Sequence, residues 1–434
     1  MSGERNKVGL KTCVALVMAN MIGTGVFASL GFQVAVLPSP FLIVVLWILG
    51  GLVALCGALS YAELAAALPR SGGEYNFLTQ VYHPAVGFMG GFVSVMVGFA
   101  APIAATAMIS GAYLAAAFPG LPALETSFAV ALGLAVVHAV TIRTSGMFQL
   151  LVTGLKISLI LAFLVLGVWK GHLPENGFGP QAGDWTAIVS APFAISLMYV
   201  LYSYSGWNAA AYIMSEVRRP EWTVPRALLL ATALVTVLYV GLNAVFLASG
   251  PLADFAGKKE VGEIAARHLL GVSGGRIMAG LIGFGLVSAI SAMTWAGPRV
   301  AQTIGQDFPA LGFLARTSDG GVPRRALALQ TVIVMLLLTT GTFEAIIAYA
   351  FVAILTCSFL TVLGVIVLRV RRPALARPFR CWGYPVTPAV FLLLNGFTLA
   401  YTFWEKPVEA TAGIATLMAG IGLYFAAKRW KVHS

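Results

Sequence analysis

Residues 8–36 read VGLKTCVALVMANMIGTGVFASLGFQVAV, an apolar stretch long enough to cross a membrane that is interrupted by the small residues of Ile22–Gly25. Residues 190–216 form a second apolar stretch, which is interrupted by SYSGWN at Ser203–Asn208. A membrane-spanning helix satisfies its backbone hydrogen bonds internally, so an unwound turn persists only inside protein or beside a water-filled cavity. Paired interruptions in the two halves of one chain point to the binding site of a transporter.

The composition indicates a polytopic membrane protein. Of the 434 residues, 59% are hydrophobic and 10% are charged, whereas soluble domains carry about 25% charged residues. A spanning helix needs about 20 apolar residues. The stretches that meet this requirement are 8–36, 40–68, 84–117, 124–142, 147–169, 190–216, 222–248, 271–301, 325–341, 343–369, 384–404 and 409–427. The sequence therefore predicts an all-α polytopic membrane protein with 12 transmembrane helices.

The positions of the basic residues predict the orientation. Twenty of the 27 Lys and Arg residues fall on the side of the two termini, six fall on the other side, and Lys156 lies within a span. Because Lys and Arg accumulate in cytoplasmic loops, we expect a multi-pass protein of the cell inner (plasma) membrane with both termini cytoplasmic. The net charge of +11 follows from this bias. The basic residues are too scattered to indicate nucleic-acid binding.

The order of the stretches predicts a 5+5 inverted repeat. The interrupted stretches are the first and the sixth, so each opens a block of five helices, residues 8–169 and residues 190–369. Since five is odd, the second block enters the membrane from the opposite face, as in transporters built from inverted repeats. Residues 384–427 add helices 11 and 12. We expect a single transmembrane domain over residues 1–434, in which residues 341–344 separate helices 9 and 10.

Other classes of function leave no pattern in the sequence. The four cysteines lie in spans or in the predicted cytoplasmic loop after helix 10, so no structural disulfide is expected. The histidines and acidic residues form no cluster with metal-ligand spacing. No phosphate-binding loop is present, and no metal or cofactor is expected. We interpret His138 as a hydrogen-bonded core residue and residues 216–226 as an ion-pair cluster or a gate.

The first interruption has the chemistry of an anion site. Gly23 and Gly25 allow an unusual backbone on either side of the Thr24 hydroxyl. An unwound turn exposes the N–H groups at the start of the following half-helix, whose dipole favours a negative charge. A substrate carboxylate fits such a site. Small residues also let membrane helices pack closely, and this segment by itself leaves both interpretations open.

The second interruption favours a substrate site. Its polar, small and aromatic residues are Ser203, Tyr204, Ser205, Gly206, Trp207 and Asn208. Helix packing does not require such a sequence in midspan, where Trp is uncommon. Because helix 6 runs opposite to helix 1, its first half ends in free carbonyls that can accept bonds from an ammonium group. The two interruptions together describe a site for a zwitterionic amino acid. Tyr202 and Trp207 are large enough to cover this site, and ordinary core packing is the alternative interpretation of both residues.

Lys156 lies about nine residues into helix 5, or ~14 Å along it. A Lys inside the membrane costs roughly 2.5–3.5 kcal/mol on insertion and by default marks a functional site. Two roles are open. The ammonium group can replace a metal cation, bonding to carbonyls freed at the first interruption and to a helix 8 hydroxyl such as Ser288 or Ser291. Alternatively, Lys156 can carry a proton.

Four segments resemble motifs of the amino acid–polyamine–organocation (APC) superfamily. They are IGTGVF at Ile22–Phe27, YAELAAALPRSGGEYNFL at Tyr61–Leu78, YSYSGWNAAAYIMSEVRRPEWTVPRAL at Tyr202–Leu228 and SAMTWAGPRV at Ser291–Val300. Their order and spacing agree over about residues 10–330. The SGWN of helix 6 is similar to the prokaryotic L-type amino acid transporter (LAT) branch of that superfamily.

This resemblance implies a fold in which broken helices 1 and 6 bind the backbone of an amino acid. By position, Gly23, Thr24 and Gly25 would hold the carboxylate. The amino group would be received by carbonyls near Ile22, Tyr202, Ser203 and Ser205, with Tyr202 at the external gate. Members with a lysine like Lys156 are typically sodium-independent, because the lysine occupies the place of a sodium ion.

Two departures from the L-type pattern matter. Tyr202 stands where L-type members often have Phe, which puts a hydrophobic side-chain selectivity in doubt. The loop over about residues 118–127 lacks the cysteine through which animal members join a glycoprotein subunit. No disulfide-linked subunit is therefore expected, and the chain resembles a self-sufficient prokaryotic member.

The sequence thus predicts a sodium-independent secondary transporter of neutral L-amino acids that works by alternating access, as an exchanger (antiporter) or a proton-coupled carrier. Its expected partners are the amino acid and the lipid bilayer. The alternative within the superfamily is a polyamine or cationic amino acid transporter, which the scarcity of carboxylates in the spans disfavours. A membrane-embedded enzyme or receptor is disfavoured because no catalytic constellation is present and such a protein needs no paired interruptions.

Overall fold

The computed structural model describes residues 7–140, 142–174, 177–340 and 343–430, and these residues form helices and connecting loops without any β-strand. A single parallel bridge joins Val8 and Val217. Within the described ranges, nine helices are long and apolar enough to cross a membrane, while α7 and α10 are apolar but shorter. The predicted all-α class is confirmed, and the number of 12 spans stays a prediction.

The first predicted block contains nine helical elements. They are α1 (Leu10–Met21), α2 (Thr24–Val36), α3 (Pro40–Ala67), α4 (Glu74–Val81), α5 (Pro84–Val93), the π-helix η1 (Ser94–Phe99), α6 (Ala100–Ala117), α7 (Ala123–His138) and α8 (Ile142–Lys170). The break between α1 and α2 falls within the predicted interruption. The π-helical turn η1 lies inside the third predicted span and has no signal in the sequence.

The rest of the chain continues in the same manner. Its elements are α9 (Asp184–Ala187), α10 (Ala191–Tyr204), α11 (Ala209–Tyr212), the 3₁₀ helix η2 (Met214–Glu216), α12 (Pro220–Leu247), α13 (Leu252–Phe255), α14 (Val261–Asp307), the 3₁₀ helix η3 (Pro309–Leu314), α15 (Arg324–Thr340), α16 (Phe343–Arg371), α17 (Val386–Glu405) and α18 (Pro407–Trp430). The helix α14 starts before the predicted span at residue 271, where Gly271 has a φ of 76° and kinks the helix. The predicted boundary between helices 9 and 10 includes residues 341–342, which lie outside the described residues.

Local sequence explains where the helices begin. The helix α3 starts at Pro40, whose ring fixes a helical φ, and the Ser39 hydroxyl accepts a hydrogen bond from the Leu42 N–H. The helix α10 starts with the same combination, because the Ser190 hydroxyl accepts a bond from the Phe193 N–H and a proline stands in the first turn. These caps set the entry points of two helices that border the broken segments.

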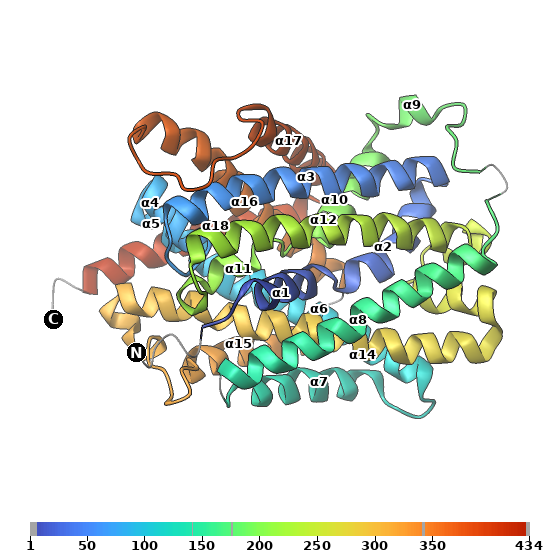
Figure 1. Cartoon of the computed structure of the whole chain (residues 1–434), viewed down its shortest axis with the longest axis horizontal. Helices are drawn as coiled ribbons and strands as arrows, with labels where there is room; N and C mark the ends of the chain where they lie inside the picture. The colour runs from blue at the N-terminus through green and yellow to red at the C-terminus, as the bar shows by residue number, and fades with distance from the viewer. Residues whose placement is uncertain (1–6, 141, 175–176, 341–342, 431–434) are drawn as a thin grey trace.

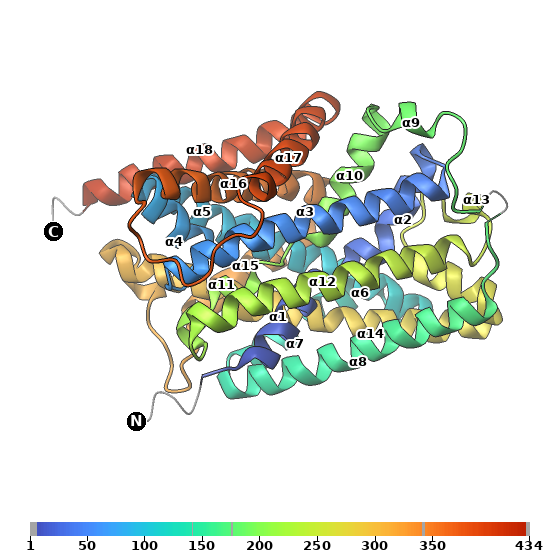
Figure 2. The same ribbon diagram turned by 45° about the horizontal axis from the view of Figure 1, so that its top comes forward.

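The broken segments lie in the middle of the helix bundle (Figures 1 and 2). In an apolar 18-residue stretch of the span formed by α1 and α2, 78% of the residues are buried inside the protein, whereas the share in α8 is 28%. Close approach of helices depends on small residues. A Cβ atom at Gly51 of α3, for example, would lie 2.2 Å from the Cγ2 atom of Thr236 in α12. The peripheral helices therefore enclose the two breaks.

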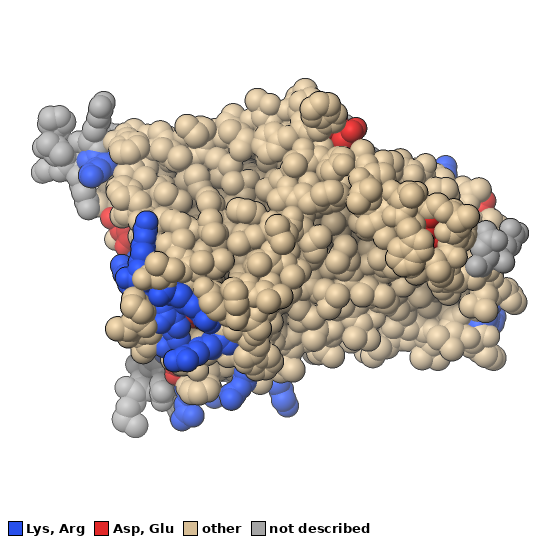
Figure 3. Space-filling view, turned by 90° about the horizontal axis from the view of Figure 1, so that it is seen from above, with Lys and Arg blue, Asp and Glu red and all other residues tan. Residues whose placement is uncertain are grey.

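The N-terminal end of α1 and the C-terminal end of α18 lie at the same end of the bundle (Figures 1 and 2). Most Lys and Arg side chains visible on the face in Figure 3 also gather at this end. We call it the terminal end. This arrangement agrees with the even number of crossings that the sequence predicts, and the assignment of the terminal end to the cytoplasm stays a prediction.

Candidate functional site

The first break is short. The helix α1 ends at Met21, α2 begins at Thr24, and only Ile22 and Gly23 lie between them. Gly23 is the N-cap of α2 and provides no side-chain cap, so the first N–H groups of α2 have no partner within the helix. Gly23, Thr24 and Gly25 all line a cavity. These N–H groups therefore provide the donors and the positive helix end that a carboxylate needs.

The second break is longer. The helix α10 ends at Tyr204 and α11 begins at Ala209. Gly206 has a φ of 97°, which favours glycine, and its carbonyl accepts a hydrogen bond of 3.1 Å from Asn20 Nδ2 in α1. Two predicted acceptors already have donors: the Tyr202 carbonyl accepts from the Ser205 N–H, and the Ser203 carbonyl accepts from the Tyr239 hydroxyl. A carbonyl oxygen has two lone pairs, so these oxygens can each accept one further bond.

The two breaks are in direct contact. A Cβ atom at Gly25 would lie 2.2 Å from the Ser203 Oγ atom and 2.6 Å from the Ser203 Cα atom, so only glycine fits at this position. The Tyr239 hydroxyl of α12 lies 2.6 Å from the Met21 carbonyl and 3.1 Å from the Ser203 carbonyl. This hydroxyl therefore joins the end of α1 to the end of α10. The structure brings the two predicted half-sites together.

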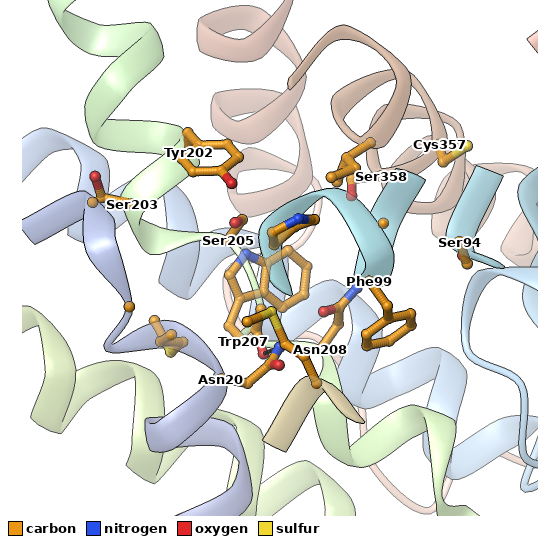
Figure 4. A pocket seen from close by; sticks show the side chains of 18 of the residues that line it. Asn20, Ser94, Phe99, Tyr202, Ser203, Ser205, Trp207, Asn208, Cys357 and Ser358 are labelled. Atoms are coloured by element: carbon orange, nitrogen blue, oxygen red, sulfur yellow. Dashed lines mark hydrogen bonds between the residues drawn. The ribbon is translucent and has the colours of Figure 1, made fainter. Parts of the chain in front are cut away.

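A cavity of about 80 Å³ lies between the breaks and the surrounding helices (Figure 4). The predicted site residues Gly23, Thr24, Gly25, Tyr202, Ser203, Ser205, Gly206, Trp207 and Asn208 line it. Ile22 is fully buried and contributes its carbonyl to the first break instead. Trp207 packs edge-on against Tyr61, with ring centroids 4.5 Å apart. Tyr202 and Trp207 are therefore both cavity walls and core residues.

Lys156 reaches the first break. Its Nζ atom, on α8, donates a hydrogen bond to the Ile22 carbonyl, and the side chain is buried. The two candidate hydroxyls on α14 have other partners. Ser288 donates to the Gly285 carbonyl, and Ser291 donates to Gln149 Oε1 at 2.9 Å. The structure thus joins Lys156 to the freed carbonyl, and a bond from Lys156 to Ser288 or Ser291 stays a prediction. Gln149 of α8, which accepts from Ser291, is a neighbour that sequence reasoning did not consider.

Sequence reasoning missed a further wall of the cavity. Asn20 of α1, Glu74 of α4, Ser94 and Phe99 of η1, Thr106 of α6, Met293 of α14, and Cys357 and Ser358 of α16 line it. Figure 4 shows Ser94, Phe99, Cys357 and Ser358 across the cavity from the second break. Among these residues, Asn20 lies two residues before the first interruption and Glu74 lies within the motif Tyr61–Leu78. These two positions could have indicated from the sequence that Asn20 and Glu74 belong to the site.

Asn20 supplies an acceptor inside the cavity. Its Nδ2 atom is bonded to Gly206, whereas its Oδ1 atom is buried and has no hydrogen-bond partner. A buried acceptor without a partner is unfavourable and is satisfied when a donor binds. The ammonium group of an amino acid is such a donor.

Glu74 is the acidic residue of the cavity, and 2% of it is exposed. It accepts hydrogen bonds of 2.7 Å from the Tyr61 hydroxyl and from Asn208 Nδ2, and a third bond from the Tyr212 hydroxyl. Burial raises the pKa of Glu74, and these hydrogen bonds act in the opposite direction. The predicted spans contain few carboxylates, but the cavity contains one, because Glu74 lies in the segment that connects two predicted spans.

The remaining expectations have clear outcomes. His138 is buried and lies 2.8 Å from the Ser291 hydroxyl through its Nε2 atom, as expected for a core residue. Glu216 forms an ion pair of 2.8 Å with Arg299 of α14, so its partner is not one of the arginines in residues 216–226. The four cysteines are free thiols. Among the described residues, no three His, Cys, Asp or Glu side chains are grouped as metal ligands.

Comparison with known proteins adds the family. The "Amino acid permease" family model matches residues 8–424. The chain is 26% identical over 442 residues to "Asc-type amino acid transporter 1" of Mus musculus, covering 98% of this chain and 82% of that protein. It is 26% identical over 448 residues to "Large neutral amino acids transporter small subunit 2" of Homo sapiens, covering 98% and 81%.

One bacterial relative matches the chain over almost the whole length of both proteins. The chain is 25% identical over 437 residues to "Serine/threonine exchanger SteT" of Bacillus subtilis (strain 168), covering 99% of this chain and 98% of that protein. The family match and these relatives agree with the spans. The chain therefore belongs to the amino acid permease family of the APC superfamily, and it is a multi-pass membrane transporter of amino acids rather than an enzyme.

Proposed function

We propose that the chain is a sodium-independent secondary transporter that exchanges small neutral L-amino acids by alternating access. The observation that carries this proposal is the direct contact between the two interrupted segments, Gly25 against Ser203, beside one small cavity. A carrier of this kind has to enclose its substrate between two gates, and the half-helices at the breaks can move without unfolding the bundle.

The cavity offers complementary groups to the two ends of an amino acid. The N–H groups that begin α2 at Thr24 and Gly25 receive the carboxylate. The ammonium group lies toward the second break, where the unpaired Asn20 Oδ1 atom and the carbonyls near Ser203 and Ser205 accept its hydrogen bonds. Each end of the zwitterion thereby replaces the water that it loses on binding.

The size of the cavity supports a small side chain. Its volume of about 80 Å³ compares with the ~10–15 Å³ that a cavity needs, on the same measure, to hold one water molecule. The wall opposite the breaks carries hydroxyl and thiol groups from Ser94, Cys357 and Ser358, which suit alanine, serine or threonine. The printed names of the relatives, a serine/threonine exchanger and transporters of neutral amino acids, point in the same direction.

Sodium independence rests on Lys156. Its ammonium group already bonds the Ile22 carbonyl at the first break, which is where a metal cation would otherwise neutralise a freed carbonyl. A second cation beside it would meet repulsion from a like charge in a medium of low dielectric constant. Lys156 therefore takes the place at the first break that a metal cation would otherwise occupy.

The topology belongs to the same proposal. We assign twelve spans in a 5+5 inverted repeat, with residues 8–169 and 190–369 as the repeats and residues 384–427 appended. The terminal end faces the cytoplasm of a plasma membrane, in accord with the Lys and Arg side chains gathered there (Figure 3). The chain works without a disulfide-linked subunit.

One observation favours a second candidate. Glu74 places a carboxyl group in the cavity, and a carboxylate attracts the side chain of a cationic amino acid or a polyamine. Its three hydrogen bonds from neutral donors already occupy much of its accepting capacity, which ranks this candidate second.

The decisive experiment is uptake into proteoliposomes of the purified chain. Radiolabelled alanine, serine, threonine, leucine, lysine and putrescine are supplied outside, with and without unlabelled serine inside, in sodium or choline buffer. We expect serine uptake that depends on internal serine and is equal in the two buffers. Preferential uptake of lysine or putrescine would favour the second candidate, a carrier of cationic amino acids or polyamines. A requirement for sodium would contradict the role proposed for Lys156.

A further inference from the structure

Glu74 differs in its partners from two other glutamates, the buried Glu63 and the partly buried Glu216. Glu63 lies 2.6 Å from Arg369 and also close to Arg377, and Glu216 lies 2.8 Å from Arg299. Glu74 is as deeply buried as Glu63, yet no Lys, Arg or His of the described residues is ion-paired with it. A buried carboxylate without a cation is unstable unless hydrogen bonds compensate or a proton neutralises it.

The groups around Glu74 are neutral at ordinary pH. Facing it are Tyr61 from α3, Asn208 and Tyr212 on either side of α11, Ser94 from η1, and Cys357 and Ser358 from α16. The titratable members are the two tyrosines and the cysteine. Burial raises the pKa of Glu74 above its ordinary value and hydrogen bonds from Tyr212, Tyr61 and Asn208 oppose this rise. Glu74 is thus a carboxyl group whose proton affinity depends on its hydrogen-bond donors.

Two of those donors belong to a part of the site that has to move. Asn208 and Tyr212 lie at the start and the end of α11, a helix of four residues on the terminal side of the second break. Glu74 itself lies on α4, so its hydrogen bonds tie α11 to α4 and, through Tyr61, to α3. Such bonds are stronger when the carboxyl group is ionised than when it is neutral.

We propose that Glu74 is a proton-binding site that controls the gate on the terminal side of the cavity. The ionised carboxylate holds α11 closed through Asn208 and Tyr212. A proton taken from water in the cavity binds one carboxylate oxygen, weakens both bonds and lets α11 swing away, so that substrate is released. This inference rests on the proposed function, and it names Glu74 rather than Lys156 as the residue that gains and loses the proton.

The test measures the pH dependence of serine exchange in proteoliposomes between pH 5.5 and pH 8.5, with equal pH on both sides. A single controlling proton raises the wild-type rate by up to tenfold per pH unit of acidification above the midpoint. Glu74→Gln resembles the protonated form, so its rate is expected to be independent of pH and close to the wild-type rate in acid. Glu125→Gln removes an exposed carboxyl group on α7 and is expected to keep the wild-type profile.

A wild-type profile in Glu74→Gln overturns the inference. Should Glu74→Gln fail to bind serine, the pH profile of Glu74→Asp is measured instead. The shorter side chain of Asp changes the hydrogen bonds from the donors and should therefore shift the midpoint of the profile. A midpoint shifted by at least half a pH unit supports the proposal, and an unchanged midpoint overturns it. Absence of any amino acid exchange by the wild-type chain would contradict the proposed function instead, so the two failures are distinguishable.

Discussion

The two breaks are held by different kinds of group. The first is two residues long and is braced by a cation, Lys156, and by the Tyr239 hydroxyl. The second is four residues long and is held by hydrogen bonds from two amide groups, Asn20 to the Gly206 carbonyl and Asn208 to the Glu74 carboxyl group. The proposed protonation of Glu74 weakens the second of these bonds, whereas the Lys156 bond at the first break does not depend on it. The first break is therefore the anchor of the site and the second is its moving part.

The contact between the breaks gives the largest expected effect. Gly25→Val places a side chain against the Ser203 backbone and should lower serine exchange at least a hundredfold, because the two half-sites are forced apart. Gly23→Ala is the matched control, since its Cβ atom meets no atom closer than 3.9 Å, and its rate should stay within about fivefold of wild type. Uptake and thermal unfolding of both variants check this. Equal losses in the two variants would show that the contact at Gly25 is not special.

Removal of the fixed cation should have the next largest effect. Lys156→Met keeps the length of the side chain but leaves the Ile22 carbonyl without its donor, at a cost of about 1–3 kcal/mol. Exchange should fall roughly tenfold to a hundredfold. Lys170→Met at the exposed end of the same helix should have no effect. An unaltered rate in Lys156→Met would remove the distinction between an anchored and a mobile break.

Asn20 should show the smallest effect. Asn20→Ala removes the hydrogen bond to Gly206 and the unpaired acceptor, and a KM increase of about threefold to tenfold is expected from the ~0.5–1.5 kcal/mol of one hydrogen bond. Asn20→Asp keeps an oxygen for the substrate ammonium but loses the donor to Gly206. Serine binding that is retained in Asn20→Asp and weakened in Asn20→Ala assigns the acceptor to the ammonium group. Equal KM values in the two variants would contradict that assignment.

Sequence patterns predicted local features well. The apolar stretches gave the helices within a few residues, except at α14, where the helix continues through a kink at Gly271. The interruptions at residues 22–25 and 203–208 contain the observed breaks. Lys156 was identified because a charge in an apolar stretch is conspicuous, and its bond to the Ile22 carbonyl is observed, whereas a bond to Ser288 or Ser291 stays a prediction. The π-helical turn that presents Phe99 had no signal at all.

The sequence by itself determined the helices, the two breaks and the position of one buried lysine, because hydrophobicity and backbone permissiveness are properties of neighbouring residues. The tertiary structure decided which groups meet. Lys156 and Ile22 are 134 residues apart, as are Glu74 and Asn208. Such contacts depend on how the whole bundle packs, since each helix can turn any of its faces toward the centre without changing its own sequence pattern. That is why the anchor could be suspected from the sequence, while the carboxyl group beside the moving half-helix became visible only in the folded protein.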